Sequence, residues 1–493
     1  MFGGNIMPIP KEILAIERPK STRVKKSGDR YLVIKRTSKY VQGRSVPVDL
    51  GTIGEIIGGK YVEIRKEPRK KKKTEIDIKD YGETALCSAA SDDLLQELAN
   101  TFDIESAKRL FVIALLRASD PDIRNRDIQL AYDTSFLSET IPGVHLSENT
   151  ISEFLKRVGM EYRYIRQFMQ KRIDRCSGKT LVIDGTLKDN NSITNTFSEY
   201  SRKGTTKGSK DISLVYAYDL ETREPVAVNP YQGNMLDLTS FQDFVDTFKV
   251  RRGLLVMDKG FYSKDNIKKL RDIEGLNYII PMKQSAALIK KTAINTDIVT
   301  PLTGYKEATV FYKKLKVNDQ CYLYAFRDPR TASEQEIGYV AFAQKKGSFS
   351  TEKLLAKQNE FGIIVFESKS DLNPLEVYSA YASRWEIEVM FNLFKDILDL
   401  DTVNVHGDYR AYATEFINYL SIIIATRVKS KLKTTILIPA SRTKPPVYVS
   451  DRFSFRQVLR YLSKCKKIRI DDGSWIDNKR VKYILELTSA LNL

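Results

Sequence analysis

Apolar and polar residues alternate in three short runs near the start of the chain, between Tyr31 and Ile64. Such alternation is typical of strands with one buried face, because successive side chains point to opposite sides of a sheet. The runs are separated by Gly43, by Gly51 and by the pair Gly58-Gly59, which favour turns. This part of the sequence therefore predicts a small β-sheet.

From Ser91 to Asp133 the apolar positions change to a helical spacing. A further helix is predicted in LSENTISEFLKRVG, for which Ser147 is a suitable N-cap. Two short helices, the second of them rich in cationic residues, fit a helix-turn-helix DNA-binding motif. They fit an ordinary helical bundle equally well. In the first case Asn149, Lys156 and Arg157 would face DNA, but no turn signature in the sequence decides between the two.

Strand-like patterns return after residue 176 and predict an α/β sheet with helices packed against it. Three neighbouring strands come first, and the polar turn LETRE joins the last two. A helix, a fully apolar strand, a second helix and another strand follow. The expected elements are strands at 180–186, 212–219 and 225–232, a helix at 240–250, a strand at 253–258, a helix at 263–272 and a strand at 276–281.

After Met282 the next expected helix does not arrive, and residues 283–360 are rich in turns and alternating runs. The runs ATVFYKKLKV, QCYLYAFRD and IGYVAFAQ predict a mostly antiparallel β insertion. The core resumes with a strand at 361–368, followed by a helix from Pro374 to Asp399. The remainder of the chain is predicted to be largely helical and basic.

These elements describe an α/β protein with several regions, as expected for a chain of 493 residues. A mixed sheet core carries the β-rich insertion, and N-terminal β and helical regions suited to DNA binding precede it. A helical region follows. The expected boundaries are 1–80 for the small basic β region, 81–175 for the helical region, 176–282 with 361–400 for the core, 283–360 for the insertion and 401–493 for the C-terminal region.

The balance of charges favours a polyanionic partner. The chain contains 80 lysines and arginines against 62 aspartates and glutamates, a net charge of +18. Nucleic acid is the default partner of such a protein, and an acidic membrane surface is the alternative. The basic run Arg69–Lys73 includes Lys70, Lys71 and Lys72. It fits either a solvated linker or an arm on the DNA backbone, and in both cases it adds affinity for phosphate.

Cysteine and histidine are scarce in this chain. Its four cysteines are scattered and form no CxxC pair, which argues against a zinc site or a disulfide framework and suits a reducing cytosol. With only two histidines, the chemistry must use carboxylates, lysines or hydroxyls. The amino terminus lacks a signal pattern, and the longest apolar run, Ile417–Ala425, is too short to span a bilayer. We therefore expect a soluble cytosolic protein.

Two aspartates are expected at the ends of apolar strands. Asp184 ends the run LVID, and Asp258 ends the run LLVMD. Taken singly, each is most simply a turn residue, since Asp-Gly and Asp-Lys-Gly favour turns. If both strands belong to one sheet, however, acids at their carboxyl ends converge on the crevice where α/β proteins bind ligands. Glu388, on the helix that follows the sheet, can then complete a set of three carboxylates.

Three carboxylates packed together repel one another, so they require cations. A set of oxygen ligands suits Mg²⁺, for which Mn²⁺ can substitute. Two such ions about 3.5–4 Å apart can activate an attacking oxygen and stabilise a leaving oxygen in phosphodiester displacement. The three acids therefore predict a metal-dependent site for phosphoryl transfer.

The helix expected after the sheet carries a charged stripe beside an apolar one. At about 100° per residue, one face of the helix presents a phenol, a guanidinium, a carboxylate and an ammonium group. These are Tyr381, Arg384, Glu388 and Lys395. The donors among them suit a phosphate backbone, although a surface helix with ion pairs is the alternative. Glu386 is expected to point away into solvent. The apolar stripe consists of Ile387, Phe391, Phe394 and Leu398.

The spacing Tyr-(2)-Arg-(3)-Glu-(6)-Lys resembles the YREK signature of DDE insertion-sequence transposases, whose catalytic core is ribonuclease-H-like. Four fixed residues match a chain of this length by chance in under about one case in a hundred. Other motifs follow in the same order: DGT at Asp184, YQGN at 231–234 and DKGFYS from Asp258. The intervals of 74 residues (184 to 258) and 130 residues (258 to 388) leave room for the insertion. The resemblance covers residues 176–430, and Lys259 stands where arginine is commoner.

The resemblance implies cut-and-paste transposition. In that reaction water attacks a phosphodiester at the transposon end, and the freed 3′-OH attacks target DNA without a covalent protein intermediate. The implied metal ligands are Asp184, Asp258 and Glu388. The implied contacts to end phosphates are Tyr381, Arg384 and Lys395. Double-stranded DNA, as inverted-repeat ends and as target, is therefore the expected partner.

Trp385 and Lys259 are further candidate DNA contacts, although Trp385 fits packing as well as stacking on an unpaired base. A homodimer in the prokaryotic cytosol or nucleoid is expected, because two ends must be processed together. Two other hypotheses stay open: a ribonuclease-H-like endonuclease that cuts without joining, and a transposase-derived DNA-binding protein without chemistry. The intact carboxylates argue against the second but not against the first.

Overall fold

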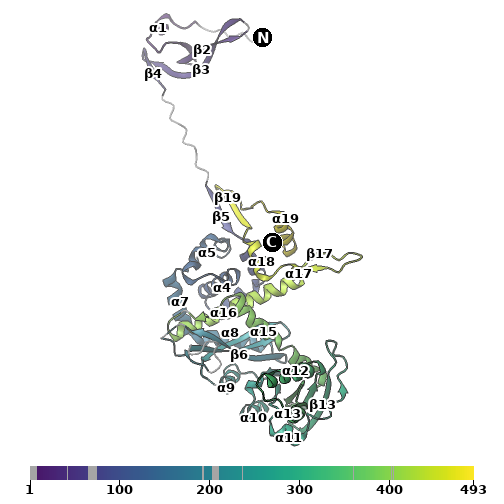
Figure 1. The fold of residues 1–493 in the computed structure, drawn as a ribbon. Helices are drawn as coiled ribbons and strands as arrows, with labels where there is room; N and C mark the ends of the chain where they lie inside the picture. The colour runs from purple at the N-terminus through teal and green to yellow at the C-terminus, as the bar shows by residue number, and fades with distance from the viewer. Residues whose placement is uncertain are drawn as a thin grey trace. The chain divides into compact units, whose positions relative to one another are not determined.

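In the computed structural model, the described residues are 8–493 with the exception of 42, 65–74, 191, 193, 202–209, 236, 359, 401 and 404. The chain divides into two compact units, Met1–Glu75 and Ile76–Leu493. Figure 1 shows the N-terminal unit in purple and the larger unit from blue through green to yellow. The basic run predicted to contact DNA through Lys70, Lys71 and Lys72 lies outside the described residues.

In its described part, the N-terminal unit is a four-stranded antiparallel sheet with one short helix. This confirms the small sheet predicted from the alternating pattern and adds one strand before it. A small core of Val24, Val33 and Ile56 closes one face, and Ile13 of the helix packs against it. The elements are α1 (Lys11–Leu14), β1 (Thr22–Ser27), β2 (Arg30–Val41), β3 (Arg44–Ile57) and β4 (Lys60–Glu63).

Within the described residues, a mixed sheet of eleven strands forms the centre of the larger unit. As predicted, β6, β8 and β9 are neighbours in the sheet. They pair antiparallel, and β10 and β11 extend the other side of β6 in parallel. The predicted helices between these strands are α9 (Asp237–Thr247) and α10 (Lys264–Asp272). The strands are β6 (Thr180–Asn190), β7 (Glu199–Tyr200), β8 (Lys210–Asp219), β9 (Glu224–Gln232), β10 (Gly253–Met257), β11 (Leu276–Pro281), β12 (Thr300–Pro301), β13 (Phe311–Asn318), β14 (Cys321–Arg327), β15 (Ile363–Ser368) and β16 (Thr402–Val403).

Helices that precede and follow the core in the sequence lie together beside the sheet (Figure 1), and α8 and α16 contact β9. The longest, α16 (Asp408–Thr434), contacts α4, α7 and β9, and its apolar run Ile417–Ala425 is buried. No helix in the described part of the chain combines the length and apolar character needed to cross a membrane. The other helices are α2 (Gly82–Ala89), α3 (Asp92–Ala99), α4 (Ile104–Ser119), α5 (Ile128–Thr134), α6 (Leu137–Thr140), α7 (Glu148–Met160) and α8 (Tyr162–Arg175).

Helix α7, the candidate DNA-reading helix, packs into this bundle. Ser147 caps it as predicted, since the Ser147 hydroxyl accepts the Thr150 N–H at 3.3 Å. The Arg157 guanidinium donates to Ser106 Oγ of α4 at 3.1 Å, so it is turned toward the bundle. Asn149 and Lys156 are exposed. A DNA-reading role for α7 stays a prediction, with Asn149 and Lys156 as its available side chains.

Residues 283–360 differ from the β insertion predicted from their alternation. β12, β13 and β14 are antiparallel, as expected, and extend the central sheet beyond β15. The run IGYVAFAQ, however, lies in α12 (Pro329–Lys345), so its assignment to a strand is wrong. Asp328 accepts the Arg330 N–H at 2.9 Å and Pro329 opens the helix, and these start signals outweigh the later alternation. The insertion also contains α11 (Ala287–Thr292) and α13 (Thr351–Gln358).

The C-terminal part closes back onto the start of the larger unit. β19 (Lys466–Ile470) pairs antiparallel with β5 (Ile76–Asp80). The boundary expected at residue 80 therefore falls after Glu75 in the structure, because the partner of β5 comes from the far end of the chain. The remaining elements are β17 (Ile436–Ile438), β18 (Val447–Tyr448), α17 (Val449–Arg452), α18 (Phe455–Leu462), β20 (Ile476–Asp477) and α19 (Lys482–Leu491).

A buried ion pair ties β6 to α16. Lys188 Nζ lies 2.7 Å from Glu415 Oε1, and both side chains are only 1% exposed. The Lys188 ammonium also lies 5.3 Å from the centre of the Phe394 ring. Because Asp184 is on the same strand as Lys188, this pair helps to fix the position of Asp184 relative to the helices.

Replacing Lys188 with methionine is expected to lower the free energy of unfolding by about 3–5 kcal/mol, because the Glu415 charge is left buried without its partner. The double variant Lys188→Met/Glu415→Gln should recover part of that loss, because it buries no isolated charge. Urea unfolding followed by circular dichroism measures both. Equal losses in the single and double variants would contradict this account.

Candidate active site

Asp184 lies inside β6 and not at the end of a strand. The strand continues to Asn190, so the prediction of a strand-end aspartate is wrong. The apolar run stops at Asp184, and from there to Asn190 only Lys188 is buried, while the other positions of β6 are half-buried or exposed. The Asp184 carboxylate accepts the Gly185 N–H at 2.8 Å. Burial raises the pKa of Asp184 to about 6, while Arg384 and the Gly185 N–H act in the opposite direction.

Asp258 directly follows β10, as predicted. β10 runs parallel to β6 with Met257 opposite Ile183, so Asp258 and Asp184 occupy matching positions on adjacent strands. The Asp258 carboxylate also accepts the Gly260 N–H at 3.1 Å, which forms the tight turn after the strand. The expectation that both acids lie in one sheet and converge is therefore confirmed.

Glu388 lies on a helix that is broken on both sides. The single helix predicted from Pro374 to Asp399 consists of α14 (Pro374–Ala382), α15 (Trp385–Asn392) and a π-helical turn at Leu393–Ile397. The Glu388 side chain is 56% exposed. The third carboxylate is therefore accessible from solvent, whereas the Asp184 side chain is 15% exposed.

The apolar stripe beside Glu388 is buried, as predicted. Ile387, Phe394 and Leu398 are fully buried, and Phe391 packs against the same core. Glu386 is not directed into solvent as expected. It is half-buried in a small cavity that Lys429 of α16 also lines, because α16 packs beside α15.

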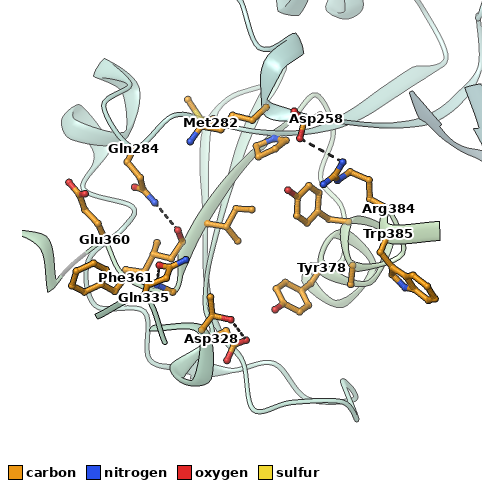
Figure 2. Close-up of a pocket in the computed structure, with 18 of the residues that line it drawn as sticks. Asp258, Met282, Gln284, Asp328, Gln335, Glu360, Phe361, Tyr378, Arg384 and Trp385 are labelled. Carbon is orange, nitrogen blue, oxygen red and sulfur yellow. Dashed lines mark hydrogen bonds and ion pairs between the residues drawn. The ribbon is translucent and has the colours of Figure 1, made fainter. Parts of the chain in front are cut away.

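Arg384 connects the three carboxylates. Its Nη1 lies 2.8 Å from Asp184 Oδ2 and 3.7 Å from Asp258 Oδ1, and its Nη2 lies 2.8 Å from Glu388 Oε1. Arg384 occupies the break between α14 and α15, and Figure 2 shows its guanidinium directed toward Asp258. Acids from two strands and one helix therefore surround a single cation.

A protein-family model described as a transposase DDE domain matches residues 176–423, more than half of the 493 residues. The chain belongs to the transposase DDE domain family. Among solved structures, the piggyBac transposase synaptic complex with hairpin DNA matches with a TM-score of 0.37 and 11% identity, over 77% of this chain and 79% of that chain. A comparison with curated protein sequences gives no match.

Transposases with a DDE domain generally use divalent metal ions, and the donors of this site fit them. Three carboxylates supply the oxygen ligands that Mg²⁺ and Mn²⁺ prefer. As they stand, no three His, Cys, Asp or Glu side chains in the described residues are grouped to hold an ion. In this site the Arg384 guanidinium is the cation that offsets the repulsion among the acids.

A cleft of about 850 Å³ opens beside the carboxylates of the DDE domain. In Figure 2, Asp258 and Arg384 face each other at one end, and Gln284 and Glu360 line the wall across from Arg384. Asp328, at the start of α12, lines the cleft from the insertion. The insertion thus completes the cavity next to the three acids.

The other residues predicted to contact DNA are placed differently around this cleft. Tyr381 lines it and packs on Phe366, with ring centres 4.5 Å apart. Trp385 also lines it and is 53% exposed, which leaves its ring free for stacking. Lys259 is exposed at the rim. Lys395 is half-buried on the π-helical turn, and it does not line the cleft.

Two cations at the cleft rim were not predicted from the sequence. Lys283 and Lys290 line a small hollow together with Lys259. Lys283 comes shortly after β11, which is a neighbour of β10. Side chains at the carboxyl ends of neighbouring strands converge on one crevice, and this rule, which applies to Asp258, also applies to Lys283. Three ammonium groups therefore line this hollow, and one of them, that of Lys259, also lines the cleft.

Replacing Lys259 and Lys283 with glutamine is expected to weaken DNA binding by the full chain. Each lost phosphate contact should reduce the slope of log K against log salt by about 0.9, so the pair should reduce it by up to about 1.8. Fluorescence anisotropy with a 40-base-pair duplex at several salt concentrations measures the slope. The control variant Lys345→Gln/Lys353→Gln removes the same charge from exposed positions on α12 and α13. An equal effect of both variants would argue against a specific rim contact.

Proposed function

We propose that the protein is a cut-and-paste transposase. It cleaves double-stranded DNA at the inverted-repeat ends of a mobile element and transfers the freed 3′-OH ends to target DNA. The observation that carries the proposal is the convergence of Asp184, Asp258 and Glu388 within the segment that matches the DDE domain. The three acids surround Arg384 beside an open, partly cationic cleft, and this arrangement supports metal-dependent phosphodiester chemistry on DNA.

The proposed division of labour follows from the geometry. Asp184 and Asp258 lie on adjacent strands and form the rigid part of the ligand set, whereas Glu388 is exposed on a short helix. Divalent ions bound there would activate the attacking oxygen and stabilise the leaving oxygen. Lys259 would hold a DNA phosphate at the rim, and the Tyr381 hydroxyl would donate to one inside the cleft, which both residues line.

The finer classification is part of the same proposal. A central strand, β6, with antiparallel neighbours on one side and parallel ones on the other, supports a ribonuclease-H-like core. The spacing of Tyr381, Arg384, Glu388 and Lys395 supports the YREK group of insertion-sequence transposases. Because two ends must be joined in one event, we also propose a homodimer on DNA in the cytosol. We also propose the division into regions expected from the sequence, with the end of the first region at Glu75.

The experiment begins with the DNA around the coding sequence, where inverted repeats bounded by short duplications are expected. A labelled duplex with one such end is incubated with the full chain, Mg²⁺ and a supercoiled target plasmid. The expected products are a nick or break at the repeat boundary and a labelled strand joined to the plasmid.

The same assay separates the other hypotheses. Cleavage at the boundary without any joined product would indicate an endonuclease that cuts DNA without joining it, and would contradict the proposed transposition. Binding to the end without either product in Mg²⁺ or Mn²⁺ would favour a DNA-binding protein without chemistry. Products from duplexes of unrelated sequence at an equal rate would contradict end recognition.

A further inference from the structure

The N-terminal unit carries most of the excess positive charge of the protein. Residues 1–75 contain 19 lysines and arginines against eight aspartates and glutamates, a net +11 of the total +18. The carboxylate site and its cleft lie entirely in the other unit. The charge of the N-terminal unit therefore calls for a polyanionic partner of its own.

The distal halves of β2 and β3 form a two-stranded ribbon without a core. The strands stay paired out to Val41 and Arg44, and every described residue from 37 to 50 is exposed. Two shifts in strand register separate the ribbon from the sheet, one after Val33 and one after Lys35. Such irregularities increase the local twist of a strand pair. The ribbon is therefore a twisted extension that adds nothing to the core of its own unit.

The charged side chains of the ribbon are almost all positive. Residues 35–50 contain four cations and a single acid, Asp49. Asp49 is held at the base of the ribbon by ion pairs with Arg23 and with Arg36, whose Nε lies 3.2 Å from Asp49 Oδ1. Lys39 and Arg44, near the tip, have no ion pair with any described residue. The acid is thus neutralised where the ribbon begins, and the free cations are at its end.

The strand register places these cations on one face together with methyl groups. Residues directly opposite in an antiparallel pair share a face, and so do residues two apart. The pairs Val41–Arg44, Lys39–Val46 and Thr37–Val48 therefore lie on the same face. Lysine and arginine bind the guanine edge in the major groove, and small apolar groups contact the thymine methyl. This face therefore combines the two kinds of side chain that read base edges.

We propose that the β2–β3 ribbon is a DNA-binding arm that enters the major groove of duplex DNA with its Lys39–Arg44 face. Two strands about 4.8 Å apart fit between the walls of a groove about 12 Å wide, and five residues per strand, about 17 Å, exceed its depth of about 8.5 Å. Lys39 and Arg44 contact the base edges and the adjoining phosphates. This arm shares only its partner, DNA, with the proposed transposase function and does not depend on cleavage.

The test uses the full chain in EDTA, so that no strand is cut and the outcome does not depend on catalysis. Two 40-base-pair duplexes of equal sequence are compared, one with cytosine and one with glucosylated 5-hydroxymethylcytosine, which fills the major groove. Wild-type protein is expected to prefer the unmodified duplex. In Lys39→Gln/Arg44→Gln the affinity for that duplex should fall about tenfold or more, and the preference should largely disappear.

Two further variants make the result specific to the ribbon. Lys11→Gln/Lys60→Gln removes the same charge from exposed positions elsewhere in the N-terminal unit and should retain the preference for the open groove. The charge-conserving variant Lys39→Arg/Arg44→Lys should retain most of the affinity, because both positive charges stay at the tip of the ribbon. An unchanged affinity and preference in Lys39→Gln/Arg44→Gln would overturn the proposal. So would a dimer, seen by sedimentation, that this variant disrupts without changing DNA binding, because the ribbon would then bind a second copy of the chain.

Discussion

Asp258→Asn is expected to abolish strand cleavage and joining while leaving the fold and DNA binding intact. The amide has the shape of the carboxylate but lacks the charge needed to hold a divalent cation next to phosphate. A loss of at least about 1,000-fold in rate, or about 4 kcal/mol of transition-state stabilisation, is expected. Of the three acids, Asp258 offers the cleanest test. Its local contacts are the Gly260 N–H and a 3.7 Å approach of Arg384, so little of the structure depends on its charge.

Cleavage of a labelled end duplex in Mg²⁺ measures this effect, and anisotropy in EDTA checks that binding is preserved. Asp265→Asn is the matched control, because it makes the same chemical change at an exposed position seven residues further along the chain. The control should cleave at the wild-type rate. Joining activity above background in Asp258→Asn would remove Asp258 from the catalytic site.

The positions of the acids in the fold follow partly from local sequence patterns. A short, fully apolar run indicates a buried strand, and Asp258 directly follows the strand that this run forms. Helical spacing relative to the apolar stripe favours Glu388 over Glu386; the stripe is buried and Glu388 is exposed, while its role as a metal ligand stays a prediction. The convergence of the acids also followed, since it requires only that β6 and β10 belong to one sheet.

The features that were missed depend on partners far away in the chain. β6 extends past Asp184 because β8 pairs with its polar half, which the apolar run alone does not reveal. The half-burial of Glu386 depends on α16, and the boundary after Glu75 depends on the pairing of β5 with β19. Local periodicity contains no information about these contacts. The break before α15 was missed for a related reason, since Ser383 and Arg384 are ordinary helix residues by propensity.

The second-largest effect is expected for Arg384→Gln. This effect is a change in the stability and metal response of the protein, and it is measured without DNA. The variant leaves Asp184, Asp258 and Glu388 facing one another without their shared cation. Loss of the charged hydrogen bonds should lower the free energy of unfolding by about 1–3 kcal/mol in EDTA. Added Mn²⁺ should then raise the Tm by more than in the wild type, because the ion meets no competing guanidinium. Thermal unfolding across a MnCl₂ titration measures both effects.

The variant Arg384→Lys separates charge from geometry, since a lysine keeps the cation but cannot bridge the acids as a planar fork. Its stability in EDTA should lie between those of the wild type and Arg384→Gln. If Arg384 served only to bind DNA phosphate, both variants would weaken DNA binding and leave the metal-free Tm and its Mn²⁺ response unchanged. The observed distances favour the other outcome, because the guanidinium contacts Asp184 and Glu388 at 2.8 Å each. Any phosphate contact by Arg384 must therefore replace these bonds, so metal binding and DNA binding at this site are expected to strengthen each other.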